Sequence, residues 1–103
     1  MNSGDPKERP FDIVMAPSAL KGYKKFDLPL QNKIKEEAKV ISISPHGFKS
    51  LSGPLEGIFS HRFSFNHAQY RIAYQINEAN HTIEILLVKS RENFYQKLLH
   101  ILE

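Results

Sequence analysis

Cysteine and tryptophan are both absent from the 103 residues of this chain. Without thiols the protein has no disulfide scaffold, no thiolate zinc site and no cysteine nucleophile, and it fits a reducing compartment. The longest apolar run, 83–88, contains Glu84 and is far shorter than the roughly 20 residues of a membrane-spanning helix. The N-terminus resembles neither a signal peptide nor a transit peptide. We therefore expect a cytoplasmic protein that makes no contact with membranes.

The remaining composition is that of an ordinary folded domain with a modest positive charge. Hydrophobic residues make up 41% of the chain, charged residues 24%, and the formal net charge is +3. This length supports one hydrophobic core. We expect a flexible N-terminal tail over 1–9 and a single domain over 10–103. The positive charge slightly favours a polyanionic partner over none.

The first half of the domain has the pattern of a strand followed by two helices. Apolar residues at every second position from Phe11 to Met15 predict a strand. Pro17 suits the first turn of a helix, which we expect to run to about Phe26. Asp27 can cap a second, amphipathic helix, in which apolar residues recur at three- and four-residue spacing: Leu30, Ile34, Ala38 and Ile41.

The second half predicts three strands and a last helix. Alternating apolar residues over 58–65, 70–76 and 82–89 are separated by short turns, which imply antiparallel pairing. In the third strand Ile83, Ile85 and Leu87 should share one face. Ser90 can cap a helix that ends near Leu102. The prediction is an α+β fold, β-α-α-β-β-β-α, with an antiparallel twisted sheet packed against a helical hairpin. Its other face should be concave and carry Ser60, Arg62, Ser64 and Arg71.

The positive charge is concentrated on that second face. Arg62 and Arg71 fall on the same face of adjacent strands, and Lys89 and Arg91 lie where the third strand meets the last helix. Like charges placed together need a counter-ion, and a phosphate matches the planar fork of arginine. The alternative is that each arginine pairs with a carboxylate of its own: Glu56, Glu78, Glu84 or Glu92.

Other candidate residues are few. Tyr95 lies four residues after Arg91, a spacing that places both on one face of a helix. A tyrosine beside arginines can act as a base or stack on a nucleobase, or can simply pack at the edge of the core. His61 adjoins Arg62, but strand alternation points it to the opposite face. The five histidines lack metal-ligand spacing, and no GxSxG or glycine-rich phosphate loop is present, so we expect neither metal nor cofactor.

Three motifs follow one another through the second half of the chain. They are the loop and strand Leu51–Arg62 (LSGPLEGIFSHR), the strand Tyr70–Tyr74 (YRIAY), and Arg91 followed by Tyr95. In this order they resemble the RelE/ParE toxin superfamily of type II toxin–antitoxin systems. A leucine–glycine loop, an arginine-bearing strand, a YRxxY strand and an RxxxY step are typical of that family. The resemblance runs from about Phe11 to the end, and 55–62 is most similar to the YoeB-type toxins.

The resemblance implies a RelE-like fold and a choice of activities. RelE-like members are endoribonucleases that cut mRNA at the ribosome, whereas ParE-like members poison DNA gyrase. The arginines and Tyr95 favour a metal-independent endoribonuclease, whose partners are a cognate antitoxin, mRNA and the ribosome. The alternative is a ParE-like inhibitor that binds DNA gyrase and has no nuclease activity. A third possibility is an inactive module that binds only an antitoxin.

For RNA cleavage we predict a catalytic set and an RNA-binding set. The catalytic set is Arg62, Arg71, Arg91, Tyr95 and His61, and the RNA-binding set is Lys49, Arg62 and Lys89. Arg62 and Arg71 stabilise the phosphate, Arg91 either stabilises the leaving side or acts with them, and Tyr95 is a base or stacking platform. His61, Lys49 and Glu56 are reserve acids or bases. The chain departs from the family at two positions: Ser64 replaces a basic residue of RelE, and Lys49 falls at or near the YoeB-type glutamate. The YoeB-type terminal histidine is also unmatched.

Overall fold

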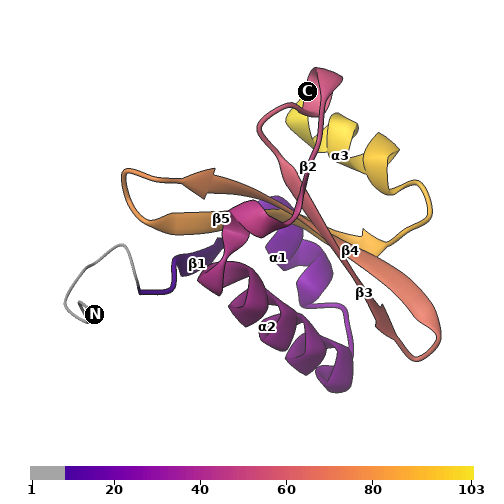
Figure 1. The fold of residues 1–103 in the computed structure, drawn as a ribbon. Coiled ribbons are helices and arrows are strands. Elements are labelled where there is room, and N and C mark those ends of the chain that lie inside the picture. The colour runs from indigo at the N-terminus through magenta and orange to yellow at the C-terminus, as the bar shows by residue number, and fades with distance from the viewer. Residues whose placement is uncertain (1–8) are drawn as a thin grey trace.

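The computed structural model describes residues 9–103, so the predicted flexible tail, 1–9, lies outside the described residues except for Arg9. Five strands form one sheet in the order β1-β5-β4-β3-β2. Helices α1 and α2 cover one face of the sheet, and α3 packs on the other (Figure 1). The strands are β1 (Asp12–Met15), β2 (Lys49–Ser50), β3 (Phe59–Phe65), β4 (Ala68–Asn77) and β5 (Thr82–Ser90). The helices are α1 (Pro17–Tyr23), α2 (Leu28–Ile43) and α3 (Phe94–Leu102).

The helical hairpin forms as the sequence predicts. Asp27 caps α2, and its Oδ1 accepts a hydrogen bond from the backbone N–H of Leu30 at 3.2 Å. The apolar stripe predicted for this helix is buried against the sheet: Leu30, Ile34, Ala38 and Ile41. The first helix is shorter than expected and ends at Tyr23, three residues before Phe26. Within 9–103, no helix has both the length and the apolar character of a membrane span.

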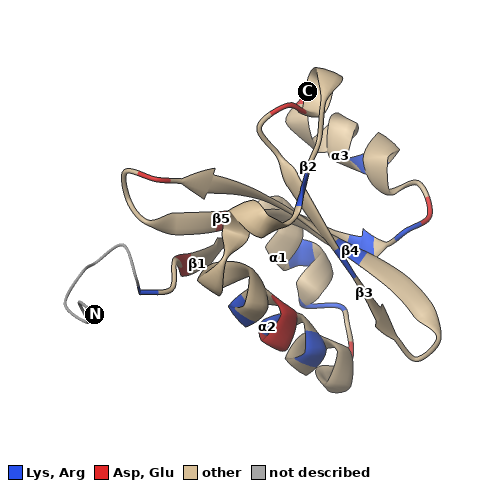
Figure 2. Cartoon of the chain, viewed as in Figure 1, with Lys and Arg blue, Asp and Glu red and all other residues tan. Residues whose placement is uncertain are grey.

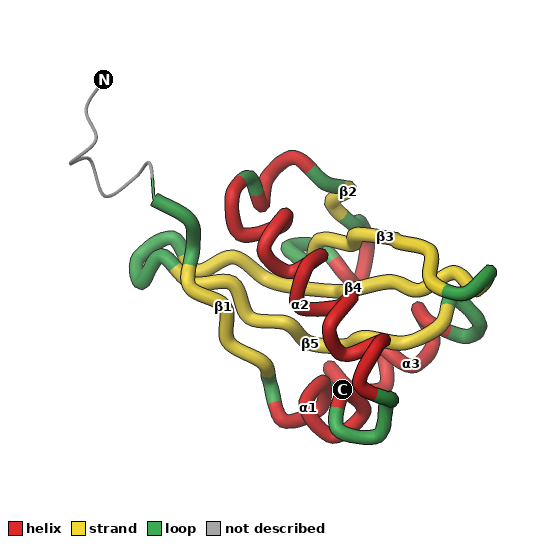
Figure 3. Tube along the Cα trace, turned by 90° about the horizontal axis from the view of Figure 1, so that it is seen from below, coloured by secondary structure: helices red, strands yellow, loops and turns green. Residues whose placement is uncertain are grey.

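The sheet is mixed, which corrects the prediction of a purely antiparallel one. β3, β4 and β5 pair antiparallel, and Asn66 and His67 join β3 to β4 in a two-residue turn with positive φ values of 48° and 65°. β1, however, pairs with β5 in parallel, with Asp12 opposite Thr82. Short turns reveal only the pairing of strands that they connect, and no turn connects β1 to β5 (Figure 3).

A β-bulge in β5 changes the predicted face of Leu87. Tyr74 pairs with Ile85, but the preceding Ala73 pairs with Leu87, so Leu86 is an extra residue in β5. Leu87 therefore does not share a face with Ile83 and Ile85, and the prediction was wrong there. Together with Ala73, it is buried in a second core beneath α3, made of Ala16, Leu55, Ile58, Ala73, Leu86, Leu87, Phe94 and Leu98. The predicted open face is thus partly covered by α3.

The last helix begins later than predicted. Ser90 is the final residue of β5, not a helix cap, because the β4–β5 ladder continues through Tyr70↔Ser90. The backbone N–H of Arg91 then donates to the carbonyl of Gln69 at 3.0 Å. Asn93, at φ 56°, turns the chain into α3. Arg91 and Tyr95 therefore do not share a helix, which corrects the predicted spacing argument.

Candidate functional site

Four basic residues come from four neighbouring strands onto the face of the sheet opposite α2. Arg62 in β3 pairs with Arg71 in β4, and Arg71 pairs with Lys89 in β5. Lys49 in β2 pairs with Ser60, two residues before Arg62. Directly paired residues place their side chains on the same face. In Figure 2 the basic segments of these strands lie close together across the sheet.

The β5 bulge decides which residue lies beside Arg71. If the register of Tyr74↔Ile85 continued unchanged, Val88 would stand opposite Arg71 and Lys89 would point to the helical face. The extra residue Leu86 shifts the register by one position, so Lys89 takes that place. The bulge thus adds a cation to the row formed by Arg62 and Arg71.

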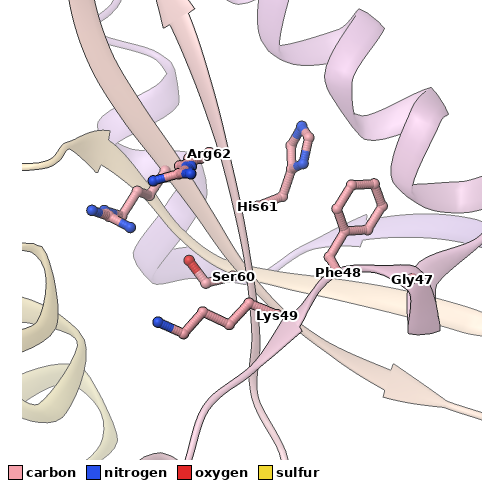
Figure 4. Close-up of a pocket in the computed structure, with 7 residues that line it drawn as sticks. Gly47, Phe48, Lys49, Ser60, His61 and Arg62 are labelled. Atoms are coloured by element: carbon pink, nitrogen blue, oxygen red, sulfur yellow. The ribbon is translucent and has the colours of Figure 1, made fainter.

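A pocket of about 460 Å3 opens beside these strands. Figure 4 shows Lys49, Ser60 and Arg62 pointing to one side of β3, while His61 and Phe48 point to the other. The lining residues are Gly47, Phe48, Lys49, Ser60, His61, Arg62 and Arg71. The loop before β3 contains Gly57, whose φ of 92° is a conformation that suits glycine. The two-residue strand β2 then holds Lys49 at the pocket.

The arginines of the pocket have no carboxylate partners among residues 9–103. The ion pairs of that region involve other groups, and Glu78 pairs with His46 at 2.6 Å rather than with an arginine. The alternative of arginines paired one by one with glutamates was therefore wrong. The Nε atom of Arg71 is buried and has no hydrogen-bond partner within the described chain. An unsatisfied buried donor costs about 1–3 kcal/mol, so the protein itself leaves part of this guanidinium group unsatisfied.

Tyr95, in the first turn of α3, contacts Arg71 of the pocket. Its hydroxyl accepts a hydrogen bond from Nη1 of Arg71 at 3.2 Å, and the Arg71 Cζ lies 5.4 Å from the centre of the Tyr95 ring. The buried neighbours Phe94 and Leu98 fix the helix in the second core. The tertiary packing of α3 therefore places Tyr95 against Arg71, whereas the sequence predicted that it shares a helix face with Arg91.

Arg91 lies outside the pocket of Arg62 and Arg71. It lines a second pocket with His67, Gln69 and other residues at the end of the hairpin. Lys89 takes the position nearer to Arg71, and its Nζ donates hydrogen bonds to the backbone carbonyls of Ser90 (3.4 Å) and Glu92. The sequence predicted a cluster of Arg62, Arg71 and Arg91. In the structure Lys89 takes the place of Arg91 beside the other two arginines.

His61 points to the helical face, as strand alternation predicts. Its Nε2 lies 2.5 Å from Oε1 of Glu37 in α2, and Lys33 Nζ lies 3.0 Å from Oε2 of the same carboxylate. The ring of Phe48 packs edge-on at 4.5 Å. Burial alone would raise the pKa of Glu37, but the hydrogen bonds and charges of His61 and Lys33 outweigh it and lower that pKa below its ordinary value. His61 thus holds β3 to α2 on the side away from Arg62.

Two features of this site had no clear signal in the sequence. One is the strand pairing of Lys49, because a two-residue strand has no periodicity to detect. The other is the bulge at Leu86. All four residues of 85–88 are apolar, so the sequence does not show which of them point to each face of the sheet. Within 9–103, no group of three His, Cys, Asp or Glu residues is placed to hold a metal ion.

The chain matches the family model of the ParE-like toxin of type II bacterial toxin–antitoxin systems over residues 13–99. No curated protein matches the sequence. Among solved structures, the toxin–antitoxin complex RelBE2 of Mycobacterium tuberculosis is similar at 28% identity and a TM-score of 0.72, covering 84% of this chain and 98% of the other. The YoeB dimer of Staphylococcus aureus is similar at 26% identity and a TM-score of 0.61, and the match covers 79% of this chain and 97% of the other. A mutant of the Escherichia coli toxin RelE in the free state has 17% identity and a TM-score of 0.73, and the match covers 89% of this chain and 97% of the other. This likeness shows the shared fold.

Proposed function

This chain belongs to the ParE-like toxin family of type II bacterial toxin–antitoxin systems, and we propose that it acts as a metal-independent endoribonuclease that cleaves mRNA at the ribosome. The observation that carries the proposal is the directly paired Arg62 and Arg71, which no carboxylate within 9–103 neutralises. Two adjacent guanidinium groups on an open sheet face fit the oxygens of a phosphodiester.

Cleavage of RNA without metal proceeds by attack of the ribose 2′-oxygen on the adjacent phosphorus. The bond from phosphorus to the 5′-oxygen breaks, and a 2′,3′-cyclic phosphate and a free 5′-hydroxyl result. One group must accept the 2′-hydroxyl proton, one must stabilise the charged phosphorane, and one must protonate the 5′-oxygen. We assign stabilisation of the phosphorane to Arg62 and Arg71.

Two lysines flank the arginine pair and suit the two proton transfers. In-line displacement places the attacking and leaving oxygens on opposite sides of phosphorus. Lys89 and Lys49 lie on opposite sides of the arginines, in β5 and β2. Hydrogen bonds to two backbone carbonyls hold Lys89 Nζ in place, and we assign Lys89 as the acid and Lys49 as the base. Tyr95 positions Arg71 and offers a stacking surface.

The proposed partners are mRNA, the ribosome and a cognate antitoxin, in the cytoplasm. Support comes from the kind of proteins to which the chain is similar: the Mycobacterium tuberculosis neighbour is a toxin–antitoxin complex, and so is an Escherichia coli RelBE neighbour. No metal or cofactor has a place in this scheme, and Arg91 and His61 have no direct part in the chemistry.

The test is an Arg71→Ala variant expressed without antitoxin, with transcript 5′ ends mapped after induction. We expect wild-type protein to generate new 5′-hydroxyl ends and the variant to lose about 10²–10³ in cleavage rate. Lys39→Ala is the matched control, because Lys39 is an exposed cation on α2, behind the sheet. Circular dichroism checks that both variants fold. If folded Arg71→Ala protein cleaves RNA at nearly the wild-type rate, the assignment is wrong.

The second candidate is inhibition of DNA gyrase, which the ParE-like name of the matching family favours. It needs binding to a protein and no cleavage of phosphodiesters. Growth arrest with DNA damage and intact transcripts would support it. An arrest that depends on Arg71 and is accompanied by new 5′-hydroxyl ends would instead support the nuclease.

A further inference from the structure

Next to the cationic row of Arg62, Arg71 and Lys89 lies a second row of paired residues, closer to the turn between β3 and β4. Its members are Ser64, Gln69 and Arg91. Ser64 pairs with Gln69, and the Gln69 amide nitrogen donates to the Ser64 hydroxyl at 2.7 Å. Arg91 stands opposite Gln69, because its backbone N–H donates to the Gln69 carbonyl at 3.0 Å. This row lies two residues further along each strand, a shift of about 7 Å.

The second row contains a pocket of its own, of about 260 Å3. Arg91 is exposed there and forms no ion pair with any residue of 9–103. The lining combines donors and acceptors from the two strand ends and the turn: His67, Ala68, Gln69, Ser90, Arg91 and Glu92. Glu92 is its single acidic member, so the pocket can bind an anion through Arg91.

The α3 helix limits how a polynucleotide can lie on this face. Beyond Arg71 in the other direction, Ala73 and Leu87 are buried beneath Phe94 and Leu98. A strand whose phosphate sits on the arginine pair therefore cannot continue over Ala73. One exposed path leads along the strands toward the turn at His67, where the second pocket lies.

We propose that this second pocket is a subsite for the nucleotide adjacent to the scissile phosphate, and that Arg91 binds its phosphodiester. The inference rests on the proposed nuclease function. The offset between the two rows is comparable to the separation of consecutive phosphates in an extended strand. The Gln69 amide and the His67 ring supply hydrogen-bonding and stacking groups for the base or sugar beside that phosphate. Arg91 is thus a binding residue one nucleotide away from the chemistry.

Chimeric oligonucleotides can test the subsite on the free protein, and if cleavage requires the ribosome the same comparisons are made by the binding of uncleavable 2′-O-methyl oligomers of the same lengths. A single ribonucleotide in an otherwise deoxy chain fixes the cleaved bond, because only that residue has a 2′-hydroxyl. The minimal substrate has one phosphodiester, and two longer substrates add one nucleotide on the 5′ or the 3′ side. For wild-type protein we expect one of the two extensions to lower KM roughly tenfold, through a charge-assisted contact.

Arg91→Ala should abolish the KM gain from that extension and leave kcat on the minimal substrate unchanged. Arg91→Lys, which keeps the charge, should restore part of the gain, and Glu92→Gln should increase it. Binding of an uncleavable 2′-O-methyl oligomer should show a salt dependence reduced by about one phosphate contact in Arg91→Ala. Lys97→Ala on α3 is the control for the loss of an exposed cation.

The outcomes separate this inference from the proposed function. If Arg71→Ala abolishes cleavage but Arg91→Ala retains the full gain from both extensions, the subsite is wrong and the nuclease stands. The subsite is also wrong if Arg91→Ala lowers kcat on the minimal substrate, because Arg91 then acts in the chemistry. If Arg71→Ala changes neither cleavage nor binding, the nuclease proposal fails and the subsite fails with it.

Discussion

His61 and Arg62 are neighbours in β3, yet their side chains lie in opposite surroundings. His61 faces α2 and is 12% exposed, and its ring nitrogen contacts the Glu37 carboxylate, which also holds Lys33. Arg62 is exposed on the other face, beside Arg71 and Lys89, with no carboxylate partner among the described residues. One strand thus separates a face where charges are paired from a face where they are not.

This difference separates stability from binding. A charge that is partly buried and paired contributes to folding, and its removal leaves the partner unsatisfied. Unpaired cations gathered on an exposed face contribute nothing comparable, and their repulsion is relieved when an anion binds. Substitutions on the helical face should therefore change the free energy of unfolding, and substitutions on the cationic face should change RNA cleavage.

The largest expected effect comes from the helix that covers part of the cationic face. Phe94 is 1% exposed in the second core. Phe94→Ala should lower the free energy of unfolding by about 3–5 kcal/mol, measured by urea denaturation. Leu99→Ala, at a position 38% exposed on the same helix, should change it by about 0.5 kcal/mol or less. Equal losses in the two variants would mean that α3 does not pack as described.

The second effect tests the paired face. Glu37→Gln should lower the free energy of unfolding by about 1–3 kcal/mol at neutral pH, because the carboxylate loses its charged hydrogen bonds. Cleavage per folded molecule should stay at the wild-type level, unlike in Arg71→Ala. A large fall in that cleavage rate would show that the two faces are coupled.

The pH dependence of the same variant has a defined sign. The pKa of Glu37 is lowered in the folded protein, so its contribution is fully present above the ordinary carboxyl pKa. That contribution is lost as the pH falls through the lowered value. The stability difference between wild type and Glu37→Gln should therefore shrink on acidification. A difference that persists at a pH well below the lowered value would contradict the lowered pKa of Glu37.

The smallest effect concerns the contact between Tyr95 and Arg71. Tyr95→Phe removes the hydroxyl that accepts the 3.2 Å hydrogen bond but keeps the ring beside the guanidinium. Loss of one such bond amounts to about 0.5–1.5 kcal/mol, so cleavage should fall about tenfold or less. A loss of a hundredfold or more in single-turnover kinetics would instead make the phenol the base, in place of Lys49.

Much of the fold followed from local patterns. The caps and apolar spacing located α2, and alternation with short turns located β3, β4 and β5. The shared face of Arg62 and Arg71 also followed from alternation, but their direct opposition depends on the register that the two-residue turn sets. The position of Arg91 did not follow, since β5 stays paired to Ser90 and the helix starts only at Phe94.

The sequence by itself determined the element types, the helical hairpin and the arginine pair, because periodicity, capping and turn length act between residues close in the chain. Only the tertiary structure decided that Lys89 joins the arginines, that Glu37 binds His61 and that β1 lies parallel to β5. Those outcomes depend on a bulge and on contacts between segments far apart in sequence. Such contacts form only where packing of the two cores fixes the register, and no local pattern encodes them.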